Sequence, residues 1–291
     1  MHTLRLGLVL TALALALAAT ATGSTDSASQ VRGCAKSTLP LVTPGQLTLA
    51  TESPGKKPWW SGPATRAPWQ GMNPYNAKGY ESAVAYALAK RLGFSGLQVN
   101  WTPVSTAQAL EAGPKPFDFF LGQVTYGSVR ERSIDFSYAY YYVPIAFLSR
   151  RPNVYSRAKN LATLKRLAYL GVVSGSTGDR YLTRYIKPSL GPMIYDTYES
   201  ALAGMAVDQN SGLVLDLPTA YTLRPRVPGG GVIVGQFARK GTPQRFALVF
   251  PQGSKLRACV NKALAQLWNR GTIKKLQTKW LTPAGGARVL R

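Results

Sequence analysis

The spacing of apolar and polar positions predicts buried strands that alternate with amphipathic helices. Residues 117–124 are apolar or aromatic with few breaks, which is typical of a strand covered on both faces. Residues 79–92 place Leu88 and Leu92 on one helical face, and Gly93 follows as a stop signal. Further strands are expected at 46–50, 97–103, 170–173, 212–217 and 246–250, and further helices at 105–112 and 256–268, while residues 195–205 fit the end of a strand followed by a helix. This order predicts an α/β fold.

A polar turn at the carboxyl end of the strand at 117–124 carries Gln123 and Thr125. The next segment, Ser-Val-Arg-Glu, fits a capping box at a helix start. The turn therefore brings together a helix amino terminus, a hydroxyl and the guanidinium of Arg130, and this combination suits a carboxylate. The same residues also fit a capped surface helix in which Arg130 meets solvent or Asp135. The residues alone leave both interpretations open.

The chain has 291 residues, enough for one large or two modest domains with a substantial core. Its composition, 45% hydrophobic and 10% aromatic, is that of a globular protein. The formal charge of +23 results from 35 basic residues against 12 acidic ones, and the basic residues are scattered, without the block typical of a nucleic-acid-binding arm. Nucleic acid is therefore not expected as a partner. The charge suggests adhesion to anionic lipid or wall polymer, or a compositional bias.

The amino terminus has the pattern of a signal peptide, which we place at residues 1–21. Arg5 gives a positive start, residues 6–19 form an apolar run too short to span a bilayer, and residues 19–21 fit a small-residue cleavage site. Residues 22–34 begin with a stretch rich in Ser, Thr and Ala and are expected to form a flexible leader. The chain is thus predicted to be exported, to the periplasm or the extracellular cell envelope.

The two cysteines and the one histidine restrict the chemistry further. Export to an oxidising compartment favours a disulfide between Cys34 and Cys259. The alternative is lipidation of Cys34, although Arg32 stands where a small residue is wanted. The only histidine is His2, inside the predicted signal, so the mature chain has no imidazole for Ser-His-Asp or Cys-His catalysis or for a His-ligated metal. We expect no metal site and no cofactor.

Residues 123–142 resemble a segment of the family 3 solute-binding proteins, the amino-acid receptors of ABC importers. In that segment a Thr precedes an Arg by five positions, and an apolar residue, Asp-Phe-Ser and a pair of tyrosines follow. Here Thr125 and Arg130 keep the spacing, and Ile-Asp-Phe-Ser with three further tyrosines completes the pattern. Residues 271–281 resemble the family's closing pattern, Gly-Thr followed by a Trp. The resemblance spans about residues 46–281.

The resemblance implies residues that hold the carboxylate of an amino acid. Thr125 and Arg130 would bind the α-carboxylate from one lobe, with Gln123 at a position where Ser or Thr is more usual. Ser176 and Thr177 would meet the same carboxylate from the opposite lobe. They lie in a glycine-rich turn that lacks the spacing and the Lys of a Walker phosphate loop.

The resemblance also implies partners for the rest of an amino acid. Asp216, at the end of an apolar strand, would accept the α-ammonium, and Glu52 would lie near it. As residue types alone, Asp216 fits a helix N-cap as well as a ligand contact. Trp59 or Trp60 would lie against the ligand side chain, whose specificity is expected to rest on the loop at 54–78. The alternative for both tryptophans is a loop that packs on its own lobe.

These patterns and the resemblance lead to one prediction of fold and function. We expect a two-lobed α/β fold of the periplasmic-binding-protein type II, with a hinge between the lobes. Residues 35–145 and 247–291 would form the first lobe and residues 146–246 the second. A monomer would capture an amino acid or a similar small zwitterion between the lobes and deliver it to the membrane permease of an ABC importer. The alternative is an enzyme on the same fold, similar to cyclohexadienyl or arogenate dehydratases, with Glu52 as a general acid.

Overall fold

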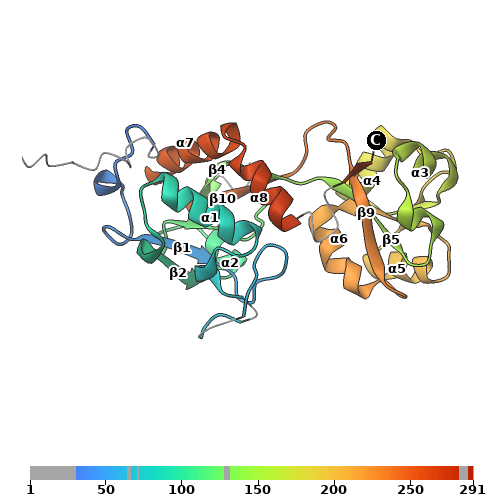
Figure 1. Cartoon of the computed structure of the whole chain (residues 1–291), viewed down its shortest axis with the longest axis horizontal. Coiled ribbons are helices and arrows are strands. Elements are labelled where there is room, and N and C mark those ends of the chain that lie inside the picture. Colours follow the sequence, from blue (N-terminus) through green and yellow to red (C-terminus); the bar gives the residue numbers. More distant parts are fainter. Residues whose placement is uncertain (1–30, 64–66, 71, 128–131, 282–287, 291) are drawn as a thin grey trace, which may run out of the picture.

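The computed structural model describes residues 31–63, 67–70, 72–127, 132–281 and 288–290. These residues form two α/β lobes that lie beside each other along the long axis of the molecule (Figure 1). Each lobe is built around one sheet, as the alternation of strand and helix patterns predicts. Across these ranges no helix combines the length and the apolar character needed to cross a membrane.

The first lobe contains a five-stranded sheet with the strand order β2-β1-β3-β10-β4. Its strands are β1 (Leu47–Thr51), β2 (Val99–Pro103), β3 (Phe119–Phe120), β4 (Ile134–Tyr142) and β10 (Arg245–Pro251). Its helices are α1 (Tyr80–Arg91), α2 (Thr106–Leu110), α7 (Leu256–Asn269) and α8 (Thr272–Leu281), with short 3-10 helices at Lys36–Thr38, Pro74–Asn76 and Gly96–Gln98. β1, β2 and β3 are parallel, whereas β10 runs antiparallel to β3 and β4.

The second lobe contains a six-stranded sheet with the strand order β11-β9-β5-β8-β6-β7. Its strands are β5 (Ile145–Arg150), β6 (Leu170–Val173), β7 (Met193–Tyr195), β8 (Gly212–Asp216), β9 (Gly231–Phe237) and β11 (Val289–Leu290). Its helices are α3 (Leu161–Leu167), α4 (Thr177–Tyr181), α5 (Tyr198–Ala206) and α6 (Leu217–Leu223), with 3-10 helices at Val154–Arg157 and Arg224–Arg226. A π-helical segment, Leu182–Ile186, continues α4.

Connections between the lobes are visible near the middle of the molecule (Figure 1). β4 of the first sheet leads directly into β5 of the second, and β9 leads back to β10. The chain crosses once more near its end, because β11 pairs in parallel with β9. Leu290 is fully buried in the core of the second lobe. Residues 288–290 therefore lie with the second lobe, and not with the first, where we expected the whole of residues 247–291.

The turn after β3 departs from the sequence prediction. The predicted strand at 117–124 is buried from Phe117 to Leu121, but its ladder is limited to Phe119–Phe120. Gln123 adopts a φ of 56°, a left-handed conformation that ends the extended backbone. The predicted capping box at 128–131, including Arg130, lies outside the described residues.

The segment before β1 is attached to the first lobe. The structure contains the predicted disulfide between Cys34 and Cys259, which joins this segment to α7. Val31 is 3% exposed, and its N–H donates to the carbonyl oxygen of Arg91 at 3.2 Å. Val31 and Cys34, at the end of the predicted leader, are therefore buried against the lobe, whereas Arg32 and Gly33 between them are exposed.

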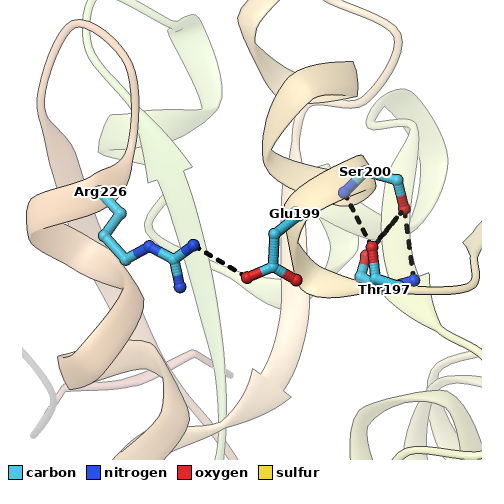
Figure 2. Close-up of polar contacts among 4 residues, drawn as sticks. All are labelled: Thr197, Glu199, Ser200 and Arg226. Carbon is cyan, nitrogen blue, oxygen red and sulfur yellow. Dashed lines mark hydrogen bonds and ion pairs between the residues drawn. The ribbon is translucent and has the colours of Figure 1, made fainter.

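Polar contacts at the start of α5 show how helices of the second lobe are held (Figure 2). The N–H of Ser200 donates to the hydroxyl of Thr197 at 3.1 Å, and the N–H of Thr197 donates to the Ser200 hydroxyl at 3.3 Å. Beside this capping box, Arg226 donates to the carboxylate of Glu199 at 2.8 Å, which lowers the pKa of Glu199. The segment after α6 is thereby joined to the start of α5.

Candidate functional site

The second lobe presents its predicted ligand residues at one edge of its sheet. β6 and β8 are parallel neighbours, and α4 and α6 begin directly after them. Gly178 lies close to β8, since a Cβ at this position would meet the carbonyl oxygen of Val214 at 2.0 Å. Ser176 and Thr177 after β6 are therefore brought to the same edge as Asp216 at the end of β8. All three side chains are half-buried.

Two of these residues, Ser176 and Asp216, already cap the helices α4 and α6 of the second lobe. The hydroxyl of Ser176 accepts a hydrogen bond from the N–H of Asp179 at 3.1 Å. The carboxylate of Asp216 accepts from the N–H of Thr219 at 2.9 Å and from its hydroxyl at 2.8 Å. Each carboxylate oxygen has two lone-pair directions, so Asp216 retains acceptor capacity for an ammonium group.

The first lobe arranges its predicted residues in the same way. β1 and β3 are parallel neighbours, so Glu52 after β1 lies at the same sheet edge as Gln123 and Thr125 after β3. Glu52 is exposed, and its carboxylate accepts from the N–H of Thr106 at 2.7 Å, at the start of α2. Thr125 is half-buried and forms a bridge with Phe246 of β10. Arg130, the predicted carboxylate anchor of this lobe, lies outside the described residues.

Gln123 is directed toward the buried carboxylate of Glu81. Its backbone N–H donates to Glu81 Oε1 at 2.8 Å, and its side-chain amide donates to Glu81 Oε2 at 3.3 Å. Tyr140 and Trp60 also donate to this carboxylate, through the phenol and the indole N–H. Burial raises the pKa of Glu81, while these hydrogen bonds lower it. The structure therefore gives Gln123 a role in shaping the turn.

Trp59 and Trp60 are buried, and their backbone packs against the start of α1. Both are 2% exposed, so neither indole face is open to a ligand in this structure. A Cβ on Gly79 would come within 2.4 Å of the Trp59 carbonyl oxygen, which shows how closely this loop packs on the helix. Trp60 also packs edge-on against Trp101, with ring centroids 5.2 Å apart. The surroundings of Trp60 match the alternative in which the loop packs on its own lobe, because Trp101 and Glu81 both belong to the first lobe.

Trp59 also takes part in a contact between the lobes. Its ring lies edge-on to Tyr221 of α6, with centroids 6.4 Å apart, and to Tyr141 of β4 at 5.3 Å. The hydroxyl of Tyr221 donates to the carbonyl oxygen of Leu281 at 2.9 Å, which joins α6 to the end of α8. Burial raises the pKa of Tyr141, and the nearby charge of Asp216 adds to the shift. An aromatic contact therefore spans the junction close to Asp216.

A cavity of about 390 Å³ lies where the two connecting segments meet the second lobe. It is lined by Tyr142, Val143, Pro144, Ile145, Thr177, Arg180, Tyr181, Arg184, Tyr185, Phe237, Ala238, Arg239, Lys240, Gly241, Thr242, Pro243 and Gln244. Thr177 is the one predicted ligand residue in this lining. Ile145, which is also in the lining, pairs with Asp216 across β5 and β8. The cavity therefore adjoins the edge that carries the predicted site.

Comparison with known proteins decides the family. The family model of the bacterial extracellular solute-binding proteins, family 3, matches residues 62–283. The chain belongs to this family. One relative is the arginine-binding extracellular protein ArtP of Bacillus subtilis (strain 168), which is 23% identical over 246 residues, covering 84% of this chain and 94% of that protein.

Solved structures resemble the fold of this solute-binding protein. An ancestral cyclohexadienyl dehydratase superimposes with a TM-score of 0.57 at 23% identity, covering 82% of this chain and 93% of that one. The L-cystine solute receptor of Neisseria gonorrhoeae, in an unliganded open conformation, gives a TM-score of 0.56 at 18% identity, covering 85% and 95% of the two chains. At such identities the likeness shows the fold alone, which is the two-lobed type II fold that the sequence predicted.

The basic lining of the cavity in this family 3 protein was missed by sequence reasoning. Its signal is visible in the helical spacing of Thr177, Arg180, Tyr181, Arg184 and Tyr185, which puts these residues on one face. The charge nevertheless looked scattered along the chain. The remaining basic residues of the lining follow β9, and only the fold brings that segment beside the helical face.

Proposed function

We propose that this family 3 protein captures an amino acid, or a similar small zwitterion, between its two lobes and delivers it to the membrane permease of an ABC importer. The observation that carries the proposal is that each lobe has a sheet edge at which its predicted ligand residues lie. Each lobe has parallel neighbouring strands whose carboxyl ends bear the residues that the family resemblance assigns to the ligand. In open α/β sheets this is the edge at which ligands bind.

The residues divide between the two charged ends of the ligand. Ser176 and Thr177 of the second lobe, with Thr125 and Arg130 of the first, would hold the α-carboxylate. Asp216 would accept the α-ammonium through the lone pairs that its cap leaves free. A ligand held at both poles would draw the lobes together around the connecting segments, which act as the hinge.

The place of action follows from the family and the amino-terminal pattern. The family is extracellular, and residues 1–21 are predicted to be a signal peptide. We propose that the mature chain acts as a monomer in the periplasm or the extracellular cell envelope. There it would meet its permease partner.

An enzyme on this fold is the second candidate, since one structural neighbour is an ancestral cyclohexadienyl dehydratase. Such a reaction needs a general acid beside the substrate. Glu52, the residue considered for this role, is exposed and accepts from the first N–H of α2, and none of the described residues that line the cavity carries a carboxyl group. These observations favour binding over catalysis.

The test uses Asp216→Asn, because Asn is also a good N-cap and the substitution removes the charge while keeping the cap of α6. Calorimetric titration with the common amino acids should find a ligand of the natural protein. The variant should bind it roughly ten- to hundredfold more weakly, because a charge-assisted hydrogen bond is lost. Unchanged affinity would remove Asp216 from the site. Turnover of prephenate or arogenate by the pure protein would favour the enzyme instead.

A further inference from the structure

The cavity beside the hinge has a chemical character that the proposed function does not use. Its floor is aromatic: Tyr181 stacks on Phe237 with ring centroids 5.8 Å apart and planes 23° apart, and Tyr185 lies 5.2 Å from Tyr181. The hydroxyl of Tyr181 donates to the carbonyl oxygen of Ala238, which fixes the ring against the segment that follows β9. The floor is therefore built by the second lobe and one connecting segment together.

Four cationic side chains surround this floor, namely those of Arg180, Arg184, Arg239 and Lys240. Arg180 donates to the carbonyl oxygen of Gly175 at 2.6 Å, and the guanidinium of Arg239 lies 4.2 Å from the centre of the Tyr142 ring. A guanidinium has five N–H groups, so these contacts leave most donors free. Arg239 is also held over a ring face, which orients its planar group.

Acids that could neutralise these cations are absent from the described lining of the cavity. No Asp or Glu is among its lining residues. Within the described part of the chain, the ion pairs are Arg150–Asp208, Arg226–Glu199 and Arg257–Asp135, and none of them involves the four cavity cations. Two acids lie near the cavity without forming an ion pair with its cations: the Asp179 carboxylate accepts from the N–H of Gly175 and the hydroxyl of Thr183, and Asp216 caps α6. The cavity concentrates positive charge over an apolar surface, and such a surface favours an anion.

We propose that the cavity binds an acid group on the side chain of the solute, so that the solute is an acidic zwitterion and not a cationic amino acid. The proposal rests on the proposed function, because Thr177 joins the cavity to the predicted site of the α-carboxylate. The cavity volume of about 390 Å³ lies within the range of small-molecule sites and leaves room for a side chain with a ring. The aromatic floor would face that ring, and the cations would meet its acid group.

The test compares ligands that have the same shape and differ in charge. One pair is L-glutamate and L-glutamine, and the other is L-4-carboxyphenylalanine and L-4-carbamoylphenylalanine. Calorimetry at about 0.15 M salt screens the general attraction of a chain with a charge of +23. At least one acid should bind tenfold or more tightly than its matched amide.

Two double variants then test whether the cavity is the source of the preference for the acid over its amide. Arg180→Ala combined with Arg239→Ala removes two exposed cations of the cavity, and Arg157→Ala combined with Arg166→Ala removes two exposed arginines elsewhere on the second lobe. Both double variants lower the net charge by the same amount. The cavity variant should lose the preference for the acid, whereas the control should keep it.

The outcomes separate the inference from the proposed function. An acid preference that survives in the cavity variant, or disappears equally in the control, overturns the inference. Tighter binding of the amides, or of arginine or a neutral amino acid, overturns it while leaving the proposed function in place. Failure of every amino acid to bind would overturn the proposed function itself, and the inference with it.

Discussion

Glu81 is the residue on which the turn after β3 depends. Its carboxylate is fully buried and accepts hydrogen bonds from the backbone N–H of Gln123 and from the indole N–H of Trp60 at 2.8 and 2.9 Å. Neither group can act as an acceptor. The helix pattern alone identifies no partner for Glu81. Its partners were not predictable, because they lie about 20 and 40 residues away in the sequence.

We expect Glu81→Gln to destabilise the protein although the side chain keeps its shape. The amide has one NH₂ group, and either orientation turns it toward the N–H of Gln123 or of Trp60. A buried donor then faces another donor, which costs about 1 to 3 kcal/mol. The neutral carboxyl group avoids this conflict, because its single O–H can donate to the Tyr140 hydroxyl and leaves lone pairs for both N–H groups. Urea unfolding at pH 5 measures the difference. Equal stability of the two proteins would show that the carboxylate does not organise this turn.

The pH dependence of stability tests the ionisation of Glu81. Burial raises its pKa above the ordinary value of 4.5, so its contribution to stability is complete below that pH and declines as pH rises through the folded-state pKa. The natural protein should therefore lose stability with rising pH relative to Glu81→Gln. Glu199→Gln is the control, because Arg226 lowers the pKa of Glu199 and its contribution is lost as pH falls. If the natural protein instead gained stability relative to Glu81→Gln as the pH rises, measured as the free energy of unfolding, the raised pKa of Glu81 would be contradicted.

At the scale of elements, the start of α1 is fixed by the loop that precedes it. Gly79 has a φ of 96°, and a Cβ there would lie 2.4 Å from the Trp59 carbonyl oxygen and 2.6 Å from the Trp60 Cα. Gly113 has a φ of 98° with nothing within 4 Å of a Cβ. The two glycines share a positive φ and differ in their surroundings.

Alanine variants of Gly79 and Gly113 allow the cost of backbone strain to be separated from the cost of steric overlap. We expect Gly113→Ala to cost about 1 to 2 kcal/mol, the penalty of the left-handed backbone. Gly79→Ala should cost about 1 to 3 kcal/mol more, because the loop must shift away from the helix. Chemical unfolding of both variants gives the comparison. Equal losses would show that the loop moves freely over α1.

Helices and strands with a clear period were predictable, and the loop and the cavity were not. The predicted helix at 79–92 corresponds to α1, Tyr80–Arg91, since Leu88 and Leu92 recur at helical spacing and glycines flank the helix. The burial of Trp59 and Trp60 depends on Gly79 and Glu81, which no local pattern connects to the loop. The basic cavity joins residues on α4 to others some 60 positions later, so its charge density is a property of the fold.

At the scale of the whole molecule, the third connection between the lobes was also invisible in the sequence. The segment Arg288–Leu290 is too short for a periodic signal, yet β11 pairs with β9 and the side chain of Arg288 donates to the carbonyl oxygen of Val234 at 3.3 Å. Two connections permit a hinge motion about one axis. We expect the third attachment, made by the edge strand β11 of the second sheet, to limit how far the lobes can separate.

We expect Leu290→Ala to weaken this attachment. Leu290 is fully buried among apolar side chains of the second lobe, so its truncation should cost about 2 kcal/mol. Val289→Ala on the same strand is the control, since Val289 is 40% exposed and its loss should cost under about 0.5 kcal/mol. If β11 restrains the lobes, small-angle scattering of the unliganded protein should give a larger radius of gyration for Leu290→Ala than for Val289→Ala. A loss of stability with an unchanged radius would mean that β11 belongs to the core of the second lobe without restraining the hinge. The two other connections, the aromatic contact between Trp59 and Tyr221 and the hydrogen bond from Tyr221 to Leu281 would then hold the lobes without it.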